Sequence, residues 1–442
     1  MTLQKLRVSA DKRHLVQEDG TPFFWLGDTA WELFLRLNRE EADRYLRNRA
    51  ERGFTVIQAI ALGETDMTRA SNAYGKSPLL RDESGECDPT LPDLVPDGEY
   101  GYWDHVDYIV DRAAHYGLYI GMLPTWGDRF HRAWGGGPEV FTADNAAVYG
   151  RWLGSRYRSR ANIIWILGGD RPLANRRHFG VIQAMAEALR EAGGGAHLMT
   201  LHPDGGHTSS AWVHEEEWLD FNMIQSGHGA NVANEAMVAS DYALVPPKPV
   251  LDAEPCYEDH PVGFNAENGF FDAKDVRQAA YRALFAGAFG HTYGHHCVWP
   301  MITEPTDYFI QTWQDAIMRP GAAQMQYVKQ LMTSRPMLDR VPDQSLLARN
   351  YKGSSRLQAC RGHDYAFIYS ANGLPITVRL GVLSGAALNA HWYDPRSGEW
   401  HFAGTVDNQG EQRFDPPSCG RQDDWVLVLD GAGKGYLGGH VE

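Results

Sequence analysis

The sequence predicts an α/β fold, a (β/α)8 barrel followed by a small all-β sandwich domain. The main observation is that eight apolar strand candidates precede residue 339, and that most are followed by a helical pattern. Such alternation is typical of a parallel sheet, and eight units in a region of this length fit a closed barrel. An open doubly wound sheet is the rival. It favours an early GxGxxG or GxxxxGK[ST] phosphate loop, which the sequence lacks.

The chain begins with a predicted hairpin over residues 6–22, with its turn at Asp19-Gly20. Asn38, followed three residues later by Glu41, predicts a capped helix that ends at Gly53. The apolar strands are predicted at 23–31, 55–62, 119–126, 163–170, 198–205, 221–228, 249–254 and 291–299. Further helices are predicted over 103–113, 142–159, 179–189, 231–243 and 273–287, the last with Asp272 as its N-cap.

Two regions depart from this alternation. Residues 63–100 are rich in Gly, Asp, Pro and Ser and are too long for a simple connection, so we expect an active-site loop that shapes the pocket. Beyond residue 338 the chain alternates in short strands, at 356–361, 364–370, 376–380, 390–395 and 425–430. We therefore predict a barrel domain over residues 1–338 and a β-sandwich over 339–442 that carries no catalytic residues.

Composition narrows the class of partner. The formal charge of −15 argues against nucleic acid or an anionic membrane. No segment reaches 18 uninterrupted apolar residues, and the amino terminus lacks the apolar core of a signal peptide. Five scattered cysteines form neither a CxxC motif nor a disulfide framework, which is typical of a reducing compartment. We expect a cytoplasmic protein.

Two carboxylates end buried strands. Asp170 follows the apolar run at 163–167 and two glycines, and Glu254 ends PVLDAE at 249–254. Numbered in order, these are the fourth and seventh strands, whose carboxyl ends face each other across a barrel pocket. Two opposed carboxylates are what glycosidic bond cleavage requires. The alternative reading is that each acid is a solvated loop residue or, for Asp170, a helix cap.

The other strand ends carry polar and aromatic side chains that could hold a sugar. Each could equally make a structural hydrogen bond or pack in the core, but together they point to one face. They are Asp28, Trp31, Gln58, Trp126, Asp128, His202, Asp204, Gln225, His228, His295 with His296, and Trp299. Trp299 is a candidate platform for a sugar ring.

A metal site is the competing chemistry. Its possible ligands are His202, Asp204, His228, Glu254 and His295. Against it, the sequence shows neither an HxH on the first strand nor an HExxH, and serine chemistry is weakened by the lack of GxSxG. We therefore expect no metal and no cofactor.

Three stretches resemble the apiosidase-like glycoside hydrolases (family 140, DUF4038). They are RHLVQEDGTPFFWLGDTAWELF (13–34), WILGGD (165–170) and LDAEPCYE (251–258). In that family a collagen-binding-type β domain often follows the barrel, and residues 340–442 are similar to it. The resemblance implies a retaining enzyme with Asp170 as general acid/base and Glu254 as nucleophile, and apiose in plant pectin as the sugar of characterised members. Where the wider superfamily has Asn-Glu, this chain has Gly169-Asp170.

We therefore expect a cofactor-free retaining glycoside hydrolase acting on plant-type oligosaccharides or glycosides. Two alternatives stay open. A carbohydrate-binding protein without turnover would keep its sugar affinity in Asp170→Asn, and a metal-dependent barrel hydrolase or isomerase would contain a metal.

Overall fold

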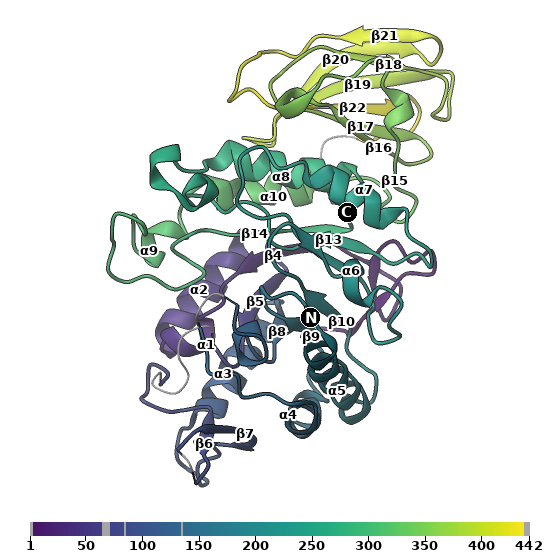
Figure 1. Ribbon diagram of the computed structural model, residues 1–442. Helices are drawn as coiled ribbons and strands as arrows, with labels where there is room; N and C mark the ends of the chain where they lie inside the picture. The colour runs from purple at the N-terminus through teal and green to yellow at the C-terminus, as the bar shows by residue number, and fades with distance from the viewer. Residues whose placement is uncertain (1–2, 64–70, 84, 134–135, 437–442) are drawn as a thin grey trace.

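The computed structural model describes residues 3–63, 71–83, 85–133 and 136–436 and shows a barrel with a second, all-β domain beside it (Figure 1). Parallel pairing runs through the strands in the order β10-β9-β8-β5-β4-β14-β13-β12. Their bounds are β4 Trp25–Thr29, β5 Val56–Ile60, β8 Tyr119–Leu123, β9 Ile163–Gly168, β10 Met199–His202, β12 Asn222–Gln225, β13 Val250–Asp252 and β14 Gly290–Tyr293. Seven of the eight lie inside a predicted range and β14 begins one residue before its range, so the barrel prediction is confirmed.

The barrel is nearly closed, with a seam between β10 and β12. Among the described residues no β-ladder joins these two strands. Instead Thr200 Oγ1 donates to the Phe221 carbonyl at 2.7 Å, and Asp220 bonds Met199 through both its backbone and its side chain. Above this point β11 (His207–Thr208) pairs antiparallel with β12. Side chains and a short reversed strand thus join the two ends of the sheet.

Helices surround the barrel. They are α1 Leu33–Arg36, α2 Arg39–Glu51, α3 Tyr102–His115, α4 Ala143–Tyr157, α5 Arg176–Gly193, α6 Ser210–Val213, α7 Asn234–Tyr242, α8 Ala273–Phe285, α9 Trp313–Ala316 and α10 Pro320–Thr333. The predicted capping box of α2 at Asn38 and the predicted N-cap of α8 at Asp272 are both present. Helix α10 was not predicted.

The amino-terminal end of the barrel is covered by a small antiparallel sheet of β1 (Leu6–Val8), β2 (Leu15–Gln17) and β3 (Pro22–Phe23). Leu6, Leu15 and Phe23 from this sheet pack with the lowest layer of the barrel interior. The predicted hairpin therefore gains a third strand. It closes one end of the barrel and leaves the carboxyl ends of the strands as the open face.

The second domain pairs β15 (Val341–Pro342), β16 (Gln358–Arg361), β17 (Tyr365–Ser370), β22 (Trp425–Gly431), β19 (Ala387–Tyr393) and β20 (Trp400–Asp407) in that order, with β18 (Ile376–Arg379) and β21 (Glu411–Phe414) as a second sheet. Strands β20 and β21 were not predicted. Most of their residues are exposed or half-buried, and β21 carries three polar residues in a row.

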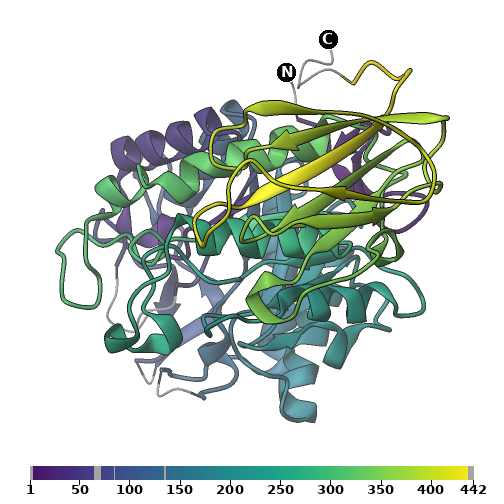
Figure 2. The same cartoon turned by 90° about the horizontal axis from the view of Figure 1, so that it is seen from above.

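The β domain sits on the outer side of helices α8 and α10 (Figures 1 and 2). Arg277 of α8 forms a buried bidentate pair with Asp424, and Arg335 pairs with Asp430. The rings of Tyr281 and Tyr369 stack at a centroid distance of 5.0 Å. No helix in the described part of the chain is both long and apolar enough to cross a membrane.

Candidate active site

The carboxyl ends of the barrel strands enclose a cavity of about 150 Å³. Its lining residues are Trp31, Trp126, Asp170, Gln225, His228, Glu254, Tyr257, His260, Phe264, His296, Trp299 and Tyr308. Both predicted carboxylates are therefore in one cavity, together with six residues predicted to contact sugar: Trp31, Trp126, Gln225, His228, His296 and Trp299. All of these residues belong to the barrel domain.

Asp170 projects from an unusual backbone. Gly168, Gly169 and Asp170 have φ angles of 83°, 120° and 55°, a left-handed run that disfavours non-glycine residues. A Cβ on Gly168 would lie 2.5 Å from the His202 carbonyl oxygen, and one on Gly169 would lie 2.8 Å from the Trp126 ring. The glycines thus permit the sharp exit from β9 that turns Asp170 into the cavity.

Arg171 holds the Asp170 carboxylate. Its Nη1 donates to Asp170 Oδ2 at 2.7 Å and to the Asp170 carbonyl at 2.5 Å. Its Nε and Nη2 donate to the two carboxylate oxygens of Asp128, at 2.8 and 2.9 Å. Asp128 and Arg171 are buried, whereas the Asp170 side chain is 29% exposed.

Glu254 lies between two histidines. Its Oε2 is 2.9 Å from His202 Nε2, and its Oε1 is 3.3 Å from His228 Nε2. Burial alone disfavours the carboxylate, but the two imidazoles outweigh it and hold the pKa of Glu254 well below its usual range. Glu254 is therefore ionised throughout the physiological pH range.

Asp170 is shifted in the opposite direction. Burial and the negative charge of Glu254 raise the pKa of Asp170 to about 6, against the opposing effects of Arg171, His202 and Gln225. Two carboxyl groups in one cavity thus differ in proton affinity, one suited to donate a proton and the other to remain charged.

Six other predicted residues have different positions. Asp28 is fully buried below the cavity, where it accepts from Tyr45 and Arg49, both at 2.5 Å. Gln58 bonds Thr29 and the Ala253 carbonyl, His295 pairs with Asp259, and Asp204 pairs with His207. None of these four lines the cavity. His202 contacts Glu254 rather than the cavity, and Asp128 contacts Arg171.

Residues after Glu254 supply a wall that sequence analysis did not assign. Tyr257 lies inside the LDAEPCYE motif and His260 follows it, and Phe264 and Tyr308 complete the group, which packs against the predicted His296. The His228 and His260 rings stack at 4.1 Å, and His296 meets His260 edge-on at 4.4 Å. Burial lowers the pKa of His260 to about 3 and that of His296 to about 2, so both rings are neutral. Of these residues, only Tyr257 could have been found from the sequence, because it lies inside the LDAEPCYE motif.

A larger cleft of about 620 Å³ adjoins this cavity, and Trp299 lines both. Its other lining residues are Glu32, Arg36, Asp128, Gly136, Arg171, Pro300, Met301, Ile302, Thr303, Glu304 and Phe309. The described part of residues 63–100, which contains β6 (Leu79–Arg81) and β7 (Cys87–Pro92), lines neither space. The expected pocket-shaping role is therefore not seen there, and residues 64–70 and 84 lie outside the described residues.

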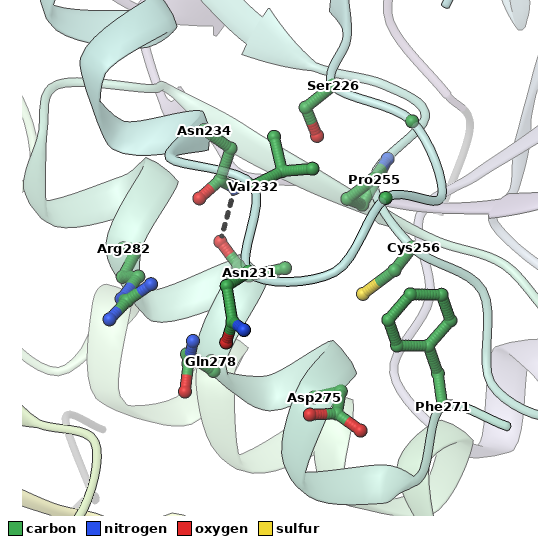
Figure 3. A pocket seen from close by; sticks show the side chains of 13 residues that line it. Ser226, Asn231, Val232, Asn234, Pro255, Cys256, Phe271, Asp275, Gln278 and Arg282 are labelled. Carbon is green, nitrogen blue, oxygen red and sulfur yellow. Dashed lines mark hydrogen bonds between the residues drawn. The ribbon is translucent and has the colours of Figure 1, made fainter. Parts of the chain in front are cut away.

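A separate pocket lies between the loops that follow β12 and β13 and helix α8 (Figure 3). At about 40 Å³ it has room for only a few water molecules. Ser226 and Asn234 beside it each donate to the buried Asp252, at 2.8 Å. The pocket thus belongs to the packing that anchors β13.

The alternative metal ligands are dispersed. His202 and His228 meet at Glu254, but Asp204 and His295 are each committed to other partners. In the parts of the chain that the structure describes, no group of three or more His, Cys, Asp or Glu side chains is arranged to hold a metal ion.

Comparison with known proteins places this site in a family. Residues 9–339 match the family described as "Apiosidase-like, catalytic domain". The chain belongs to this family. Residues 341–430 of this apiosidase-like protein match "Putative collagen-binding domain of a collagenase", the second predicted resemblance. No curated protein matches the chain.

Two solved structures resemble this apiosidase-like chain over its whole length. One, named as a glycoside hydrolase, is 37% identical, with 98% of both chains covered and a TM-score of 0.90. The other, named as a glycoside hydrolase family 5 protein from Bacteroides vulgatus ATCC 8482, is 36% identical over 98% of this chain and 95% of that chain, with a TM-score of 0.91. The protein is a glycoside hydrolase, and its enzyme class and fold, predicted from sequence, are confirmed.

Proposed function

We propose that this glycoside hydrolase works by double displacement, with Asp170 as general acid/base and Glu254 as nucleophile. The observation that carries the proposal is the opposed proton affinity of two carboxyl groups in one cavity: the pKa of Asp170 is raised to about 6 and that of Glu254 is lowered. A retaining glycosidase needs one protonated and one ionised carboxyl group at the start of its catalytic cycle.

In the first step Glu254 attacks the anomeric carbon while Asp170 gives its proton to the leaving oxygen. The glycosidic C–O bond breaks, and a glycosyl ester of Glu254 forms. That ester is neutral, so the charge that raised the pKa of Asp170 is gone and Asp170 becomes the stronger acid. As a carboxylate it then takes a proton from water, whose oxygen displaces Glu254 and regenerates both groups.

The cavity volume supports a small sugar at the reacting position. About 150 Å³ is below the roughly 300–1,000 Å³ of common small-molecule sites, so the cavity accommodates one ring. The adjoining cleft of about 620 Å³ is large enough for the rest of the molecule. We infer a terminal pentose such as apiose, carried on a plant-type oligosaccharide or glycoside, with the family description as further support.

The test is hydrolysis of a panel of p-nitrophenyl glycosides, including apiosides and other furanosides, by the parent, Asp170→Ala and Glu254→Ala. Asp204→Asn is the matched control, because this carboxylate ends the next strand but lies outside the cavity. We expect turnover of one sugar, loss in Glu254→Ala, rescue of Asp170→Ala by azide with a glycosyl azide of retained configuration, and an unchanged control.

Activity that survives in Glu254→Ala would remove the nucleophile assignment. The carbohydrate-binding alternative would replace this proposal if the parent showed no turnover and if the parent and Asp170→Asn bound sugar with equal affinity.

A further inference from the structure

A buried ion pair stands directly behind Asp170, and its position bears on the acid/base step. The guanidinium of Arg171 lies between two carboxylates, donating through one edge to Asp128 and through Nη1 to Asp170. Planar, two-point bonding of this kind fixes orientation as well as charge. Asp128 was predicted to contact sugar, but both of its oxygens accept from Arg171.

The surrounding backbone keeps this pair in place. Gly127 donates to the Gly169 carbonyl at 3.1 Å, so the loop after β8 is bonded to the loop that carries Asp170. A Cβ on Gly127 would lie 2.3 Å from that carbonyl oxygen and 2.4 Å from Arg171 Cγ. A Cβ on Gly136 would lie 2.3 Å from Asp128 Oδ2. Glycines thus allow backbone from two segments to pack directly against the Asp128–Arg171 pair.

We propose that Asp128 and Arg171 are a positioning pair that fixes the Asp170 carboxyl group and sets its proton affinity. Arg171 alone would favour the Asp170 carboxylate and so disable the acid. Asp128 offsets the charge of Arg171 while leaving its hydrogen bonds to Asp170 intact. The Arg171 guanidinium therefore orients the Asp170 carboxyl group without lowering its pKa as far as an unpaired arginine would. This inference depends on the proposed role of Asp170 in catalysis.

Other groups also face Asp170. Glu254 from the end of β13 opposes its ionisation, whereas His202 from β10 and Gln225 from β12 favour it. Tyr257, buried after β13, also interacts electrostatically with Asp170. These groups stay the same when only Asp128 or Arg171 is changed, so a shift in such variants reports the pair itself.

The experiment compares the pH profiles of kcat/KM for the parent, Asp128→Asn and the double variant Asp128→Asn/Arg171→Gln, on the p-nitrophenyl glycoside that the panel identifies. The alkaline limb reports the pKa of the acid in the free enzyme. Asp128→Asn leaves Arg171 uncompensated, so the limb moves to lower pH by about 1 unit. The double variant removes both charges but keeps similar shapes, so the limb moves to higher pH than in the parent by about 1 unit.

These opposite shifts separate the proposal from the alternatives. If Asp128 contacts sugar, KM rises and the limb stays in place. If the pair is only structural, both variants lose activity without opposite shifts. Either result overturns the inference. Because an unpaired Arg171 could prevent Asp128→Asn from folding, the double variant provides the test by itself, through its shift to higher pH.

A substrate-free measurement keeps this inference separable from the proposed function. With 13C-carboxyl aspartate labelling, the Asp170 resonance is assigned by its loss in Asp170→Asn and titrated in each variant. Opposite shifts of the Asp170 titration midpoint in the two variants support the positioning role of Asp128 and Arg171. They do so even if azide rescue fails and the catalytic assignment of Asp170 is wrong. Unmoved midpoints overturn the pair even if azide rescue succeeds.

Discussion

The ends of β9 and β13 present the two acids of the cavity in contrasting ways. Asp170 lies at the end of a left-handed backbone segment, its side chain is 29% exposed, and it forms an ion pair with Arg171. Glu254 follows β13 without a positive φ, is buried and contacts two imidazoles. The difference shows that a shared cavity does not determine acidity. Two imidazoles hold the pKa of Glu254 down, whereas burial and the charge of Glu254 raise the pKa of Asp170 against the effect of Arg171.

The largest expected effect is on turnover by substrates with different leaving groups. Glu254→Gln removes the nucleophile, so we expect a loss on the order of 10⁴-fold or more with every substrate. Asp170→Asn removes only proton transfer. We expect its kcat/KM, which reports the first step, to fall by about 10²–10⁴-fold with a poor leaving group and far less with dinitrophenolate. Steady-state kinetics on matched aryl glycosides measures both. Equal sensitivity of both variants to the leaving group would contradict the division of roles.

Next in size is the effect of the histidines beside Glu254. His228→Ala removes a hydrogen bond to a carboxylate, a contribution of about 1.5–3 kcal/mol, so we expect kcat/KM to fall by roughly 10–100-fold. The pKa of Glu254 rises in this variant, so the acidic limb of the pH profile moves to higher pH. His207→Ala is the control, because the exposed His207 ring pairs with the half-buried Asp204 outside the cavity. A fall in activity with an unmoved acidic limb would mean that His228 acts on substrate rather than on Glu254.

The two acids also differ in their contribution to stability. An unfolded Asp ionises near pH 4, but the pKa of Asp170 in the folded protein is about 6, so stability falls as pH rises through that window. Above it the carboxylate costs roughly 3 kcal/mol, and we expect Asp170→Asn to stabilise the protein at pH 7 by ~1–3 kcal/mol. The pKa of Glu254 is lowered instead, so its stabilisation is present at pH 7 and is lost as pH falls.

We therefore expect Glu254→Gln to lower the thermal midpoint at pH 7 and Asp170→Asn to raise it. The Asp170 difference shrinks between pH 7 and pH 4, whereas the Glu254 difference shrinks only below about pH 4, where an unfolded Glu binds a proton. Calorimetry at pH 4 and pH 7 measures this. Shifts of the same sign at pH 7 would mean that the two carboxyl groups have similar environments.

The smallest effect tests the backbone difference. Gly169→Ala places a methyl group 2.8 Å from the Trp126 ring at a φ of 120°, so we expect ~1–3 kcal/mol of destabilisation together with reduced turnover. Gly180→Ala is the control, because this glycine lies in α5 with open space around it, and there we expect a gain of about 0.5–1 kcal/mol. Chemical denaturation measures both. An unaffected Gly169→Ala would show that the β9 exit does not need its glycines.

The barrel was predictable because its strands are buried on both faces and read as apolar runs in the sequence. The same reading placed Asp170 and Glu254 at strand ends, and the structure brings both to one cavity. Asp28 ends a strand in the same way, yet it faces Arg49 of α2. Arg49 shares a helix face with the buried Ala42, Tyr45 and Leu46, and a charge on an apolar face indicates a buried partner.

The remaining wall of the site could not be derived from periodicity. His260, Phe264 and Tyr308 come from irregular segments, where neither the helical nor the strand repeat fixes the direction of a side chain. The contacts of Arg171 could not be derived from the sequence either. Its position next to Asp170 was visible, but its pairing with Asp128 depends on how two loops meet in space.

The seam of the barrel has a consequence for motion. Seven of the junctions between its parallel strands are hydrogen-bonded ladders, whereas β10 and β12 are joined through Thr200 and Asp220. A junction held by a few side-chain and backbone bonds opens at lower free energy than a ladder, so we expect amide hydrogen exchange to be faster there than at the ladders. His202 ends one side of this joint and Gln225 the other. Opening of this junction thus changes the distance between His202 and Gln225, which lie beside the reacting carboxyl groups. Substitutions at the junction are therefore expected to change the flexibility of the pocket.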